Sequence, residues 1–548
     1  MTGSPLAMPI RVMHRWRQRM SGVELSILFA MTGLCLFLLK GAVWVPGDLP
    51  LPLKPAFPIW QEVVWTVFHA VLALTTVVVV SLVLAGTARQ FPRFRSILVP
   101  ALSVARAVPG LGLTGLLLLF LPPLVVIVAA AAFNMIWRVL TALLDAQDTL
   151  PAELEEVATG LRMTGWQHFW RLQVPVAIPL VTFRAVQAIP GLWFRLLCVE
   201  GLMTLLMRRD VGGCGSQALV ALETHHLSWF LEAGVCAVLL IVIMDQCLIR
   251  PMTGWAQRYR LDGPQPQKKR THSWMLQFWR ETGLLNGVSV SLHTLISGVG
   301  NCRVGRTMRY VQPSSPKSLP VPGWLIPVAS LIFLGVAVAQ SHLAARLPYD
   351  VLESVLTLLH VCGALILCIV LWLPLALFFF EAGAGIFRVS RMIILAGSLF
   401  PAVLLYPAFR GLDVVPTAVL LFLGAHWLTG GTVLDAIQAI PAPFRQVARG
   451  LRLKGVLLWK RLILPAIAPD LCGGLLLAAV PIWDAVMVAE AFVPSDSGLG
   501  ATLLADMLQG QIGAQIVILM LLTLLSMLLD RLVLQPLAVY AAQKYAIR

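Results

Sequence analysis

The stretch Pro151-Ala-Glu-Leu-Glu-Glu-Val-Ala-Thr-Gly-Leu-Arg-Met-Thr-Gly165 occurs a second time, with changes, as Pro441-Ala-Pro-Phe-Arg-Gln-Val-Ala-Arg-Gly-Leu-Arg-Leu-Lys-Gly455. The two copies stand 290 positions apart and pair without a gap. The pairing continues to Pro175 and Pro465. A repeat of this kind in an apolar chain predicts a membrane protein built from two tandem, parallel modules.

The composition of the chain requires a lipid environment. Of its 548 residues, 58% are hydrophobic and 12% are charged, whereas soluble domains carry about 25% charged residues. The net charge of +15 does not indicate nucleic-acid binding, because the basic residues stand in short loops beside apolar runs. The nine cysteines are scattered without CxxC or zinc-ligand spacing, so neither a metal site nor a disulfide framework is expected.

Twelve apolar segments are long enough to cross a bilayer, and each must satisfy its own backbone hydrogen bonds there. The predicted fold is therefore an all-α polytopic membrane protein with about 12 transmembrane helices. Pro109-Gly110, Pro122-Pro123 and Pro190-Gly191 are expected to break or kink the third, fourth and fifth helices. The segments are 22–45, 60–87, 97–120, 123–144, 176–207, 229–249, 323–340, 352–380, 391–409, 413–433, 467–492 and 512–535.

Positive charge predicts the orientation of the chain. The stretches 46–58 and 493–500 are poor in lysine and arginine and fit the outer face. Six spans separate the two repeated stretches, and this even number puts both on the cytoplasmic side. The segment 283–300 is expected in the cytoplasmic linker at the membrane surface, because one more span there would invert the second half. The basic, cytoplasmic parts are the N-terminus, 89–95, both repeated stretches, 250–280 and 543–548.

Pairing outside the repeated stretch divides the chain into parts. Glu62-x-Val-x-Thr-x-x-His69 recurs as Glu353-x-Val-x-Thr-x-x-His360, and Glu200 pairs with Glu490. No proton-relay role is assigned to the two histidines. The expected parts are an N-terminal segment with the first transmembrane helix (1–59), module 1 (60–260), a cytoplasmic linker (261–321), an accessory transmembrane helix (322–349) and module 2 (350–548).

Each repeated stretch is expected to form two short helices joined by a turn. Acidic residues in the first turn favour a helix from Glu153 to Arg162, because they stabilise the positive end of its dipole. Gly165 permits a turn, and Trp166 to Val174 predicts an amphipathic helix that ends at Pro175. A single copy would fit an ordinary amphipathic connection as well, but the ungapped duplication favours a docking element that moves as a rigid lever.

Glu156-Val-Ala158, with Pro175 nineteen positions after the glutamate, resembles the EAA loop of permease subunits of ATP-binding-cassette (ABC) importers. The resemblance covers both modules and implies that each loop is a coupling helix that inserts into one ATPase subunit of a dimer. The chain departs from the family pattern at Gln446, and it has Arg162 and Arg452 where the family has a loop glycine. The implied coupling residues are Glu155, Glu156, Ala158, Gly160, Arg162, Gly165 and Pro175 in the first loop, and Gln446, Ala448, Gly450, Arg452, Gly455 and Pro465 in the second.

Two further stretches resemble the nitrate/sulfonate/taurine-type permeases, above all their duplicated, fused form. They are Trp193-Phe-Arg-Leu-Leu-Cys-Val-Glu200 and Trp483-Asp-Ala-Val-Met-Val-Ala-Glu490, the latter followed by Ser497-Gly-Leu-Gly500. The resemblance implies a type I, methionine-importer-like fold, a small anionic solute and a periplasmic solute-binding protein. The chain is accordingly expected to be a multi-pass protein of the inner membrane, in contact with lipid, with both termini in the cytoplasm.

Charged residues inside the apolar segments mark a candidate translocation path. A cluster of guanidinium groups in a water-filled path would suit an anion, and Asp484 is a candidate partner for Arg195 across the two modules. Each arginine can also mark a helix end or extend to the membrane surface, and Glu200 and Glu490 also fit hydrogen bonding to a broken helix. The candidate path residues are Arg106, Arg138, Arg195, Glu200, Asp484 and Glu490, with Arg184 as a further arginine of the same kind.

Two other functional classes include polytopic membrane proteins of this length. A secondary transporter driven by an ion gradient is the alternative, which inverted repeats or paired carboxylates deep in the bundle would favour. A membrane-embedded enzyme would need a convergent catalytic constellation, and the sequence contains none. The stretch 300–307 lacks the lysine of a phosphate-binding loop, so ATP is expected to be hydrolysed by another polypeptide and no cofactor is expected here.

Overall fold

The computed structural model describes residues 22–38, 52, 54–259, 274–282, 294, 298, 302, 346–381, 384–409, 416–493 and 498–545. Every regular element within these ranges is a helix, which confirms the all-α prediction. The predicted span 323–340 and most of the linker 261–321 lie outside the described residues, as do its segment 283–300, apart from 294 and 298, and the stretch 300–307, apart from Cys302.

Module 1 contains the first repeated stretch between two long helices. Its elements are α3 (Ile59–Gln90), α4 (Pro92–Ala107), η1 (Gly110–Leu113), α5 (Thr114–Leu117), α6 (Pro123–Asp148), α7 (Ala152–Gly160), α8 (Gly165–His168), η2 (Phe169–Gln173), α9 (Val174–Met207), α10 (Cys214–Glu223), α11 (Leu227–Met244), η3 (Asp245–Ile249), α12 (Arg250–Ala256) and η4 (Gln257–Tyr259).

Module 2 repeats this order, and within the described ranges only α5 and η4 have no counterpart. The helices α2 (Gly22–Leu38) and α13 (Trp274–Thr282) lie outside the two modules. The elements of module 2 are α16 (Leu347–Glu381), α17 (Ala384–Leu399), η5 (Ala402–Phe409), α18 (Thr417–Ala439), α19 (Ala442–Gly450), α20 (Gly455–Leu458), η6 (Trp459–Ile463), α21 (Leu464–Phe492), α22 (Leu499–Leu508), α23 (Ile512–Leu529), η7 (Asp530–Leu534) and α24 (Gln535–Tyr545).

The prediction that Pro175 ends a short helix is wrong, because the helix continues through it. Residues 165–207 form one apolar helix of 43 residues, and 455–492 form its counterpart of 38 residues. Proline has no N–H and its ring crowds the carbonyl four residues earlier, so a proline inside an α-helix removes a hydrogen bond and disfavours the regular turn before it. A π-helical turn, η2 or η6, precedes each proline and closes instead with a bond to the fifth residue back.

The predicted twelve spans are only partly matched by single helices. Eight described helices are long and apolar enough to cross a membrane, or nine if one bent pair counts as a span. That pair is α4 with η1 and α5, bent by 98° at the predicted break Pro109-Gly110. The predicted span 391–409 is likewise divided, between α17 and η5. Helix α9, by contrast, is unbroken at Pro190, where a break or kink was expected.

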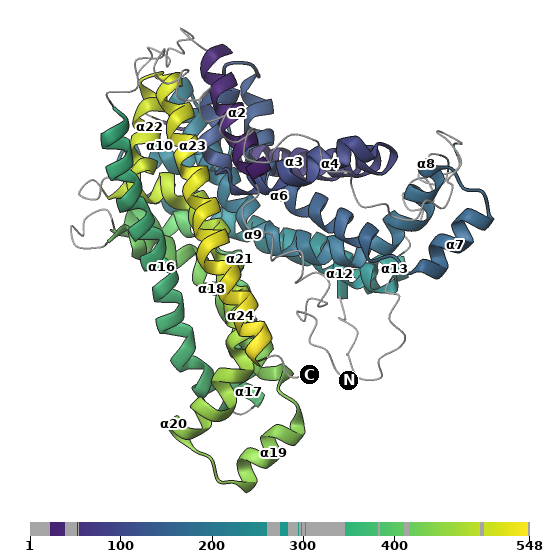
Figure 1. Ribbon diagram of the computed structural model, residues 1–548. Helices are drawn as coiled ribbons and strands as arrows, with labels where there is room; N and C mark the ends of the chain where they lie inside the picture. Colours follow the sequence, from purple (N-terminus) through teal and green to yellow (C-terminus); the bar gives the residue numbers. More distant parts are fainter. Residues whose placement is uncertain are drawn as a thin grey trace.

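The two modules form arms that diverge from a common end of the molecule (Figure 1). Helices α7 and α8 lie at the tip of one arm, and α19 and α20 lie at the tip of the other. The arms meet where η1 and α5 pack against α21 and α23, while η5 packs against α9. Glycine allows this close approach, since a Cβ at Gly115 would stand 2.6 Å from Oε1 of Gln515.

Candidate functional site

The first repeated loop is a short helix with a tightly closed C-terminus. Arg162 adopts a left-handed conformation with φ of 50°. Its N–H donates to the carbonyl of Thr159 at 3.0 Å, and the N–H of Met163 donates to the carbonyl of Ala158 at 3.1 Å. This pair of bonds is the Schellman motif, whose left-handed position is usually glycine. The turn is therefore made at Arg162 and not at Gly165, where it was expected.

The second loop has the same construction. Arg452 also has φ of 50°, and its N–H donates to the carbonyl of Arg449 at 3.0 Å. The N–H of Leu453 donates to the carbonyl of Ala448 at 3.0 Å. The family's loop glycine falls at these two arginines, so the departure noted in the sequence keeps the backbone that the glycine would favour. Gly160 and Gly450 occupy no such position, and a Cβ at either would meet nothing within 4 Å.

Both loops present the same apolar pair to solvent. Val157 and Leu161 are 58% and 64% exposed, and their counterparts Val447 and Leu451 are 58% and 66% exposed. Exposed apolar side chains rimmed by charge, at the same place in both copies, are typical of a protein-docking surface. We call 152–162 and 442–452 the coupling loops, after the role that the sequence resemblance implies for them.

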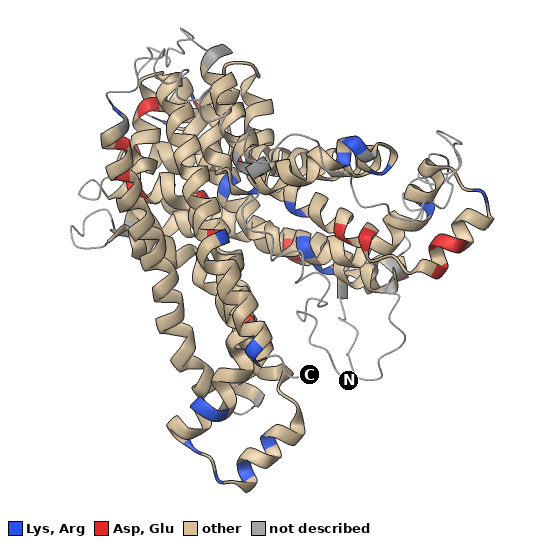
Figure 2. Ribbon diagram, in the orientation of Figure 1, with Lys and Arg blue, Asp and Glu red and all other residues tan. Residues whose placement is uncertain are grey.

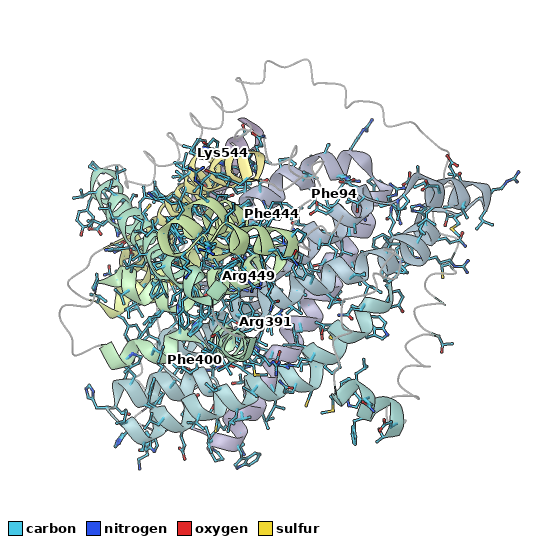
Figure 3. The ribbon with its side chains drawn as sticks, turned by 90° about the horizontal axis from the view of Figure 1, so that it is seen from below. Phe94, Arg391, Phe400, Phe444, Arg449 and Lys544 are labelled. Atoms are coloured by element: carbon cyan, nitrogen blue, oxygen red, sulfur yellow. The ribbon has the colours of Figure 1, made fainter. Side chains whose placement is uncertain are left out.

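The charge around this apolar pair differs between the coupling loops. Helix α7 carries Glu153, Glu155 and Glu156, of which Glu155 lies 3.5 Å from Arg89 of α3. Helix α19 carries Arg445 and Arg449 and no acidic residue. Figure 2 shows the contrast as red on α7 and blue on α19, and Figure 3 shows Arg449 from below.

Arg445 is held against the end of its own arm. Its Nη2 donates to the carbonyl of Ile437, and its guanidinium lies 5.3 Å from the centroid of the Phe380 ring. Burial and the nearby charge of Arg449 lower the pKa of Arg445 from its ordinary value. Arg445 therefore serves to anchor α19, while Arg449 is exposed and free to meet a partner surface.

A pocket lined by apolar residues and a few charged and amide side chains lies where the two modules meet. Its walls come mainly from α6 and α9 of module 1 and from α18 and α21 of module 2, with further residues from α17 and η5. Its empty space, part of which is open to solvent, is about 680 Å³. Arg138, Arg195 and Asp484 line it, together with Asn134 and Gln187. Nη1 of Arg195 lies 2.7 Å from Oδ2 of Asp484, which confirms the predicted pairing across the modules.

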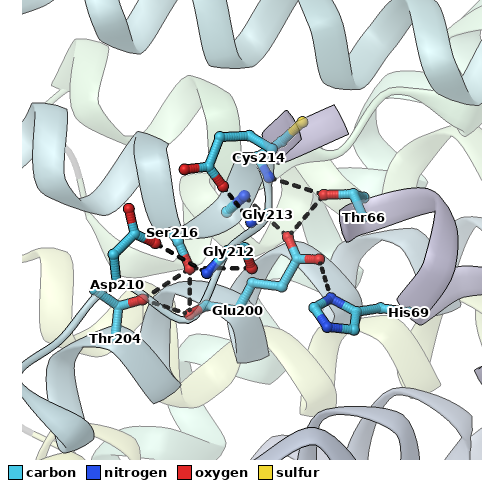
Figure 4. A network of polar contacts seen from close by, with 11 residues as sticks. Thr66, His69, Glu200, Thr204, Asp210, Gly212, Gly213, Cys214 and Ser216 are labelled. Carbon is cyan, nitrogen blue, oxygen red and sulfur yellow. Dashed lines mark hydrogen bonds and ion pairs between the residues drawn. The ribbon is translucent and has the colours of Figure 1, made fainter. Parts of the chain in front are cut away.

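Two buried clusters fix the short helices at the common end of the arms. Oε1 of Glu200 lies 2.9 Å from Nδ1 of His69, and its Oε2 accepts from the hydroxyl of Thr66 at 3.2 Å and from the N–H of Gly215 at 3.0 Å (Figure 4). The N–H of Cys214 donates to the Thr66 hydroxyl at 2.8 Å. The carboxylate thus satisfies a free N–H in the first turn of α10, where negative charge is favourable.

Module 2 contains the same cluster around α22. Nδ1 of His360 lies 2.9 Å from Oε1 of Glu490, whose Oε2 accepts from the N–H of Gly500 at 2.7 Å. The N–H of Leu499 donates to the Thr357 hydroxyl at 2.9 Å. We call the two clusters, centred on Glu200 with His69 and on Glu490 with His360, the Glu–His clamps.

The structure divides the candidate path residues into groups. Arg138, Arg195 and Asp484 come together at the pocket, whereas Glu200 and Glu490 lie in the clamps with 0% and 1% of their surface exposed. Arg106 lies on α4 and is not part of the pocket wall. Sequence reasoning did not predict the partners of the clamps. The recurring 62–69 and 353–360 stretches, which contain Thr66 and Thr357 with the two histidines, were the available signal.

These features define an all-helical multi-pass membrane protein made of two tandem copies of one module, each with a coupling loop and a clamp. Residues 77–246 and 386–535 each match the family of the binding-protein-dependent transport system inner membrane component, and the chain belongs to this family.

One relative carries the printed name "Putative ABC transporter permease protein", from Methanocaldococcus jannaschii. It is 25% identical over 124 residues, which are 23% of this chain and 46% of the relative. The match thus spans less than half of that relative's length. No solved structure matches the chain.

Proposed function

We propose that the chain is the permease of an ABC importer, which moves a small anion across the inner membrane while two separate ATPase subunits hydrolyse ATP. The observation that carries this proposal is the pair of coupling loops, built alike at the tips of the two arms. Two identically placed apolar pairs, Val157 with Leu161 and Val447 with Leu451, suit two related pockets on an ATPase dimer.

The continuity of the helices supports mechanical coupling from loop to pocket. The helix that begins at Gly165 continues to Met207 and carries Arg195 on the way. Its counterpart, from Gly455 to Phe492, carries Asp484. A force that moves either coupling loop would therefore pass through one short turn and then reach the pocket along a single helix.

The polarity of the pocket supports an anionic solute. Arg138 and Arg195 line it with two amide side chains, Asn134 and Gln187, and guanidinium groups bind carboxylate and oxyanion groups through charge-assisted hydrogen bonds. Asp484 supplies the one acidic side chain of the lining, and it is paired with Arg195. A nitrate- or sulfonate-like oxyanion fits this donor set best.

Solute would enter at the end of the molecule opposite the coupling loops. There the Glu–His clamps hold α10 and α22 in fixed positions, and a periplasmic solute-binding protein would dock on this side. A carrier driven by an ion gradient finds less support, because the two modules are parallel and each carries a coupling loop.

Co-purification tests the proposal most directly. The full chain, taken from its native membrane in mild detergent, is expected to retain ATP-hydrolysing subunits that mass spectrometry identifies by their phosphate-binding loop. Arg162→Glu and Arg452→Glu are expected to reduce the retained ATPase activity at least tenfold, about 1.4 kcal/mol, because both face the docking surface.

Arg162→Lys and Arg452→Lys are the matched controls, since they keep both the charge and a side chain at the left-handed position. They are expected to retain the ATPase. Retention of full ATPase activity by both glutamate variants would contradict the proposed docking through these loops.

A further inference from the structure

A carboxylate of module 2 sits among hydrogen-bond donors that all belong to module 1. Oδ2 of Asp484, on α21, accepts from Nη1 of Arg195 on α9 at 2.7 Å. Its Oδ1 accepts from the side-chain amide of Asn134 on α6 and from the N–H of Gly110 in η1 at 3.4 Å. Arg195 and Asp484 are each 2% exposed.

The donors are held in place by module 1 itself. Nε of Arg195 donates to the carbonyl of Ala131 at 3.2 Å, which orients the guanidinium independently of Asp484. Two glycines let the backbone approach it closely, since a Cβ at Gly191 would lie 3.2 Å from Nη1 and a Cβ at Gly110 would lie 3.3 Å from Cδ. A guanidinium, an amide and a backbone N–H that converge in this way form a preorganised anion site.

Among the residues that the structure describes, this donor set occurs once, although the repeat could have supplied two. The positions 290 residues after Asn134, Arg138 and Arg195 are Gly424, Leu428 and Ala485, and all three line the same pocket. The module 1 wall therefore carries two arginines and two amide side chains, whereas the module 2 wall is mostly apolar. Asp484 is the one charged residue on the second wall, where Ser398 is also polar, and its carboxylate accepts hydrogen bonds from the donors of the first wall.

We propose that Arg195, Asn134 and the N–H of Gly110 form the binding site for the transported anion, and that Asp484 occupies this site until the anion displaces it. This inference rests on the proposed function and adds the site and its resting occupant. The half-buried Arg138, on the same wall, offers the released carboxylate a second guanidinium.

Displacement would link solute binding to the contact between the modules. A buried guanidinium without a counter-charge is strongly unfavourable, so Arg195 must keep either Asp484 or the solute as its partner. When the anion takes the site, α21 loses its ion pair with α9 at the pocket. Solute binding thereby changes the contact between the two long helices that lead to the coupling loops.

Nitrate binding to the purified full chain in nanodiscs tests the proposal. Ionic strength is held constant with gluconate, and intrinsic tryptophan fluorescence is the readout, because Trp427 lines the pocket. Asp484→Asn removes the competing charge and keeps the shape, so the half-saturating nitrate concentration is expected to fall at least tenfold. Sulfate is titrated in the same way.

Two further variants keep the test decisive. Arg195→Lys keeps the ion pair, and with it the fold, but loses the forked donors, so nitrate binding is expected to weaken at least tenfold. Asp245→Asn is the matched control, because Asp245 pairs with Arg250 at 2.8 Å outside the pocket, and it is expected to leave nitrate binding unchanged.

The proposal is overturned if Asp484→Asn and wild type bind nitrate and sulfate equally, if neither anion gives a saturable response, or if Arg195→Lys binds as wild type does. It is also overturned if Asp245→Asn shifts binding as much as Asp484→Asn. No ATPase is present in this assay, so such a failure leaves the coupling proposal standing. Loss of ATPase retention, in turn, would leave the anion site untouched.

Discussion

Arg162 and Arg452 adopt a backbone conformation that normally favours glycine. Both have φ of 50°, a conformation that is unfavourable by about 1–2 kcal/mol for a residue with a Cβ. Arg162→Gly and Arg452→Gly are each expected to stabilise the loop by about 1 kcal/mol, measured as slower limited proteolysis of the folded chain. A faster cleavage would contradict the left-handed assignment.

Arg449→Gly provides the matched control for this prediction. It lies in the same loop, but inside helix α19, where glycine is unfavourable by about 1 kcal/mol relative to other residues. The sign of the effect should therefore reverse between positions 449 and 452, only three residues apart.

The glycines of the Glu–His clamps make a second prediction at this scale. A Cβ at Gly215 would stand 2.1 Å from the carbonyl oxygen of Leu197, and one at Gly500 would stand 2.7 Å from Cα of Met487. Gly215→Ala and Gly500→Ala are expected to destabilise the chain by about 1–3 kcal/mol, measured as a lower thermal midpoint.

Gly473→Ala is the control for the clamp glycines, because it adds the same methyl group within helix α21, where nothing lies within 4 Å. It is expected to be neutral or stabilising by up to about 1 kcal/mol. Equal midpoints for Gly473→Ala and Gly500→Ala would show that the clamp backbone does not restrict this position.

The sequence alone indicates charged residues inside apolar helices, because they are costly in lipid. It does not indicate residues whose role depends on the hydrogen-bond partners that the fold brings to them. Asp484 and Arg195 interrupt apolar helices, so their pairing could be predicted. Thr66 and Gly215 are ordinary residues of membrane helices, and their roles depend on the approach of α3 to α10, which no local pattern encodes.

At the scale of elements, helices α7 and α19 share a fold and an apolar pair but differ in charge. Arg449 on α19 faces solvent, and its counterpart on α7 is Thr159 in an acidic helix. The surface that receives α19 is therefore expected to carry negative charge. Arg449→Glu should reduce ATPase retention at least tenfold, about 1.4 kcal/mol, because it turns attraction into repulsion.

Thr159→Glu makes the equivalent change on α7 and is the matched control. It adds an acidic residue to a helix that already carries three and, unlike Arg162→Glu, removes no positive charge. The co-purified ATPase activity is therefore expected to change less than threefold, about 0.6 kcal/mol. Equal losses for the two variants would mean that the partner surfaces do not distinguish the charge of the loops.

The existence of most elements could be predicted, and their ends could not. Long apolar runs predicted α3, α6 and α18, since only a helix satisfies its own backbone in lipid. Pro175 was expected to end a helix, because proline usually does, but a π-helical turn accommodates it. The short helix α10 was missed, since ten residues are too few for a span and its N-terminus is stabilised by Glu200 from another helix.

At the scale of the whole molecule, two near-equal arms enclose a pocket that is not symmetric. The repeat explains the coupling loops and the clamps, which occur in both modules with the same contacts. The pocket breaks this symmetry, because its donors come from module 1 and its acid from module 2. Duplication within one chain permits this division, since the two copies can then diverge independently.

The path of the chain through the arms makes a prediction about sidedness. Helix α9 runs from the first coupling loop to the common end of the arms, where the next helix, α10, ends at Glu223. Helix α21 runs from the second coupling loop to the same end. Both coupling loops should then face one side of the membrane, and Glu223 the other. Cysteine accessibility can measure this, because Cys302 is exposed and the other eight cysteines are buried or half-buried.

In a Cys302→Ser background, Glu153→Cys and Pro443→Cys are expected to react with an impermeant maleimide only after the cytoplasmic face is opened. Glu223→Cys, at the C-terminal end of α10, is the matched control, and it is expected to react in intact cells. Because ATP is available only in the cytoplasm, coupling requires both loops to lie on that side. Labelling of positions 153 and 443 from opposite faces would make it impossible for one ATPase dimer to reach both arms.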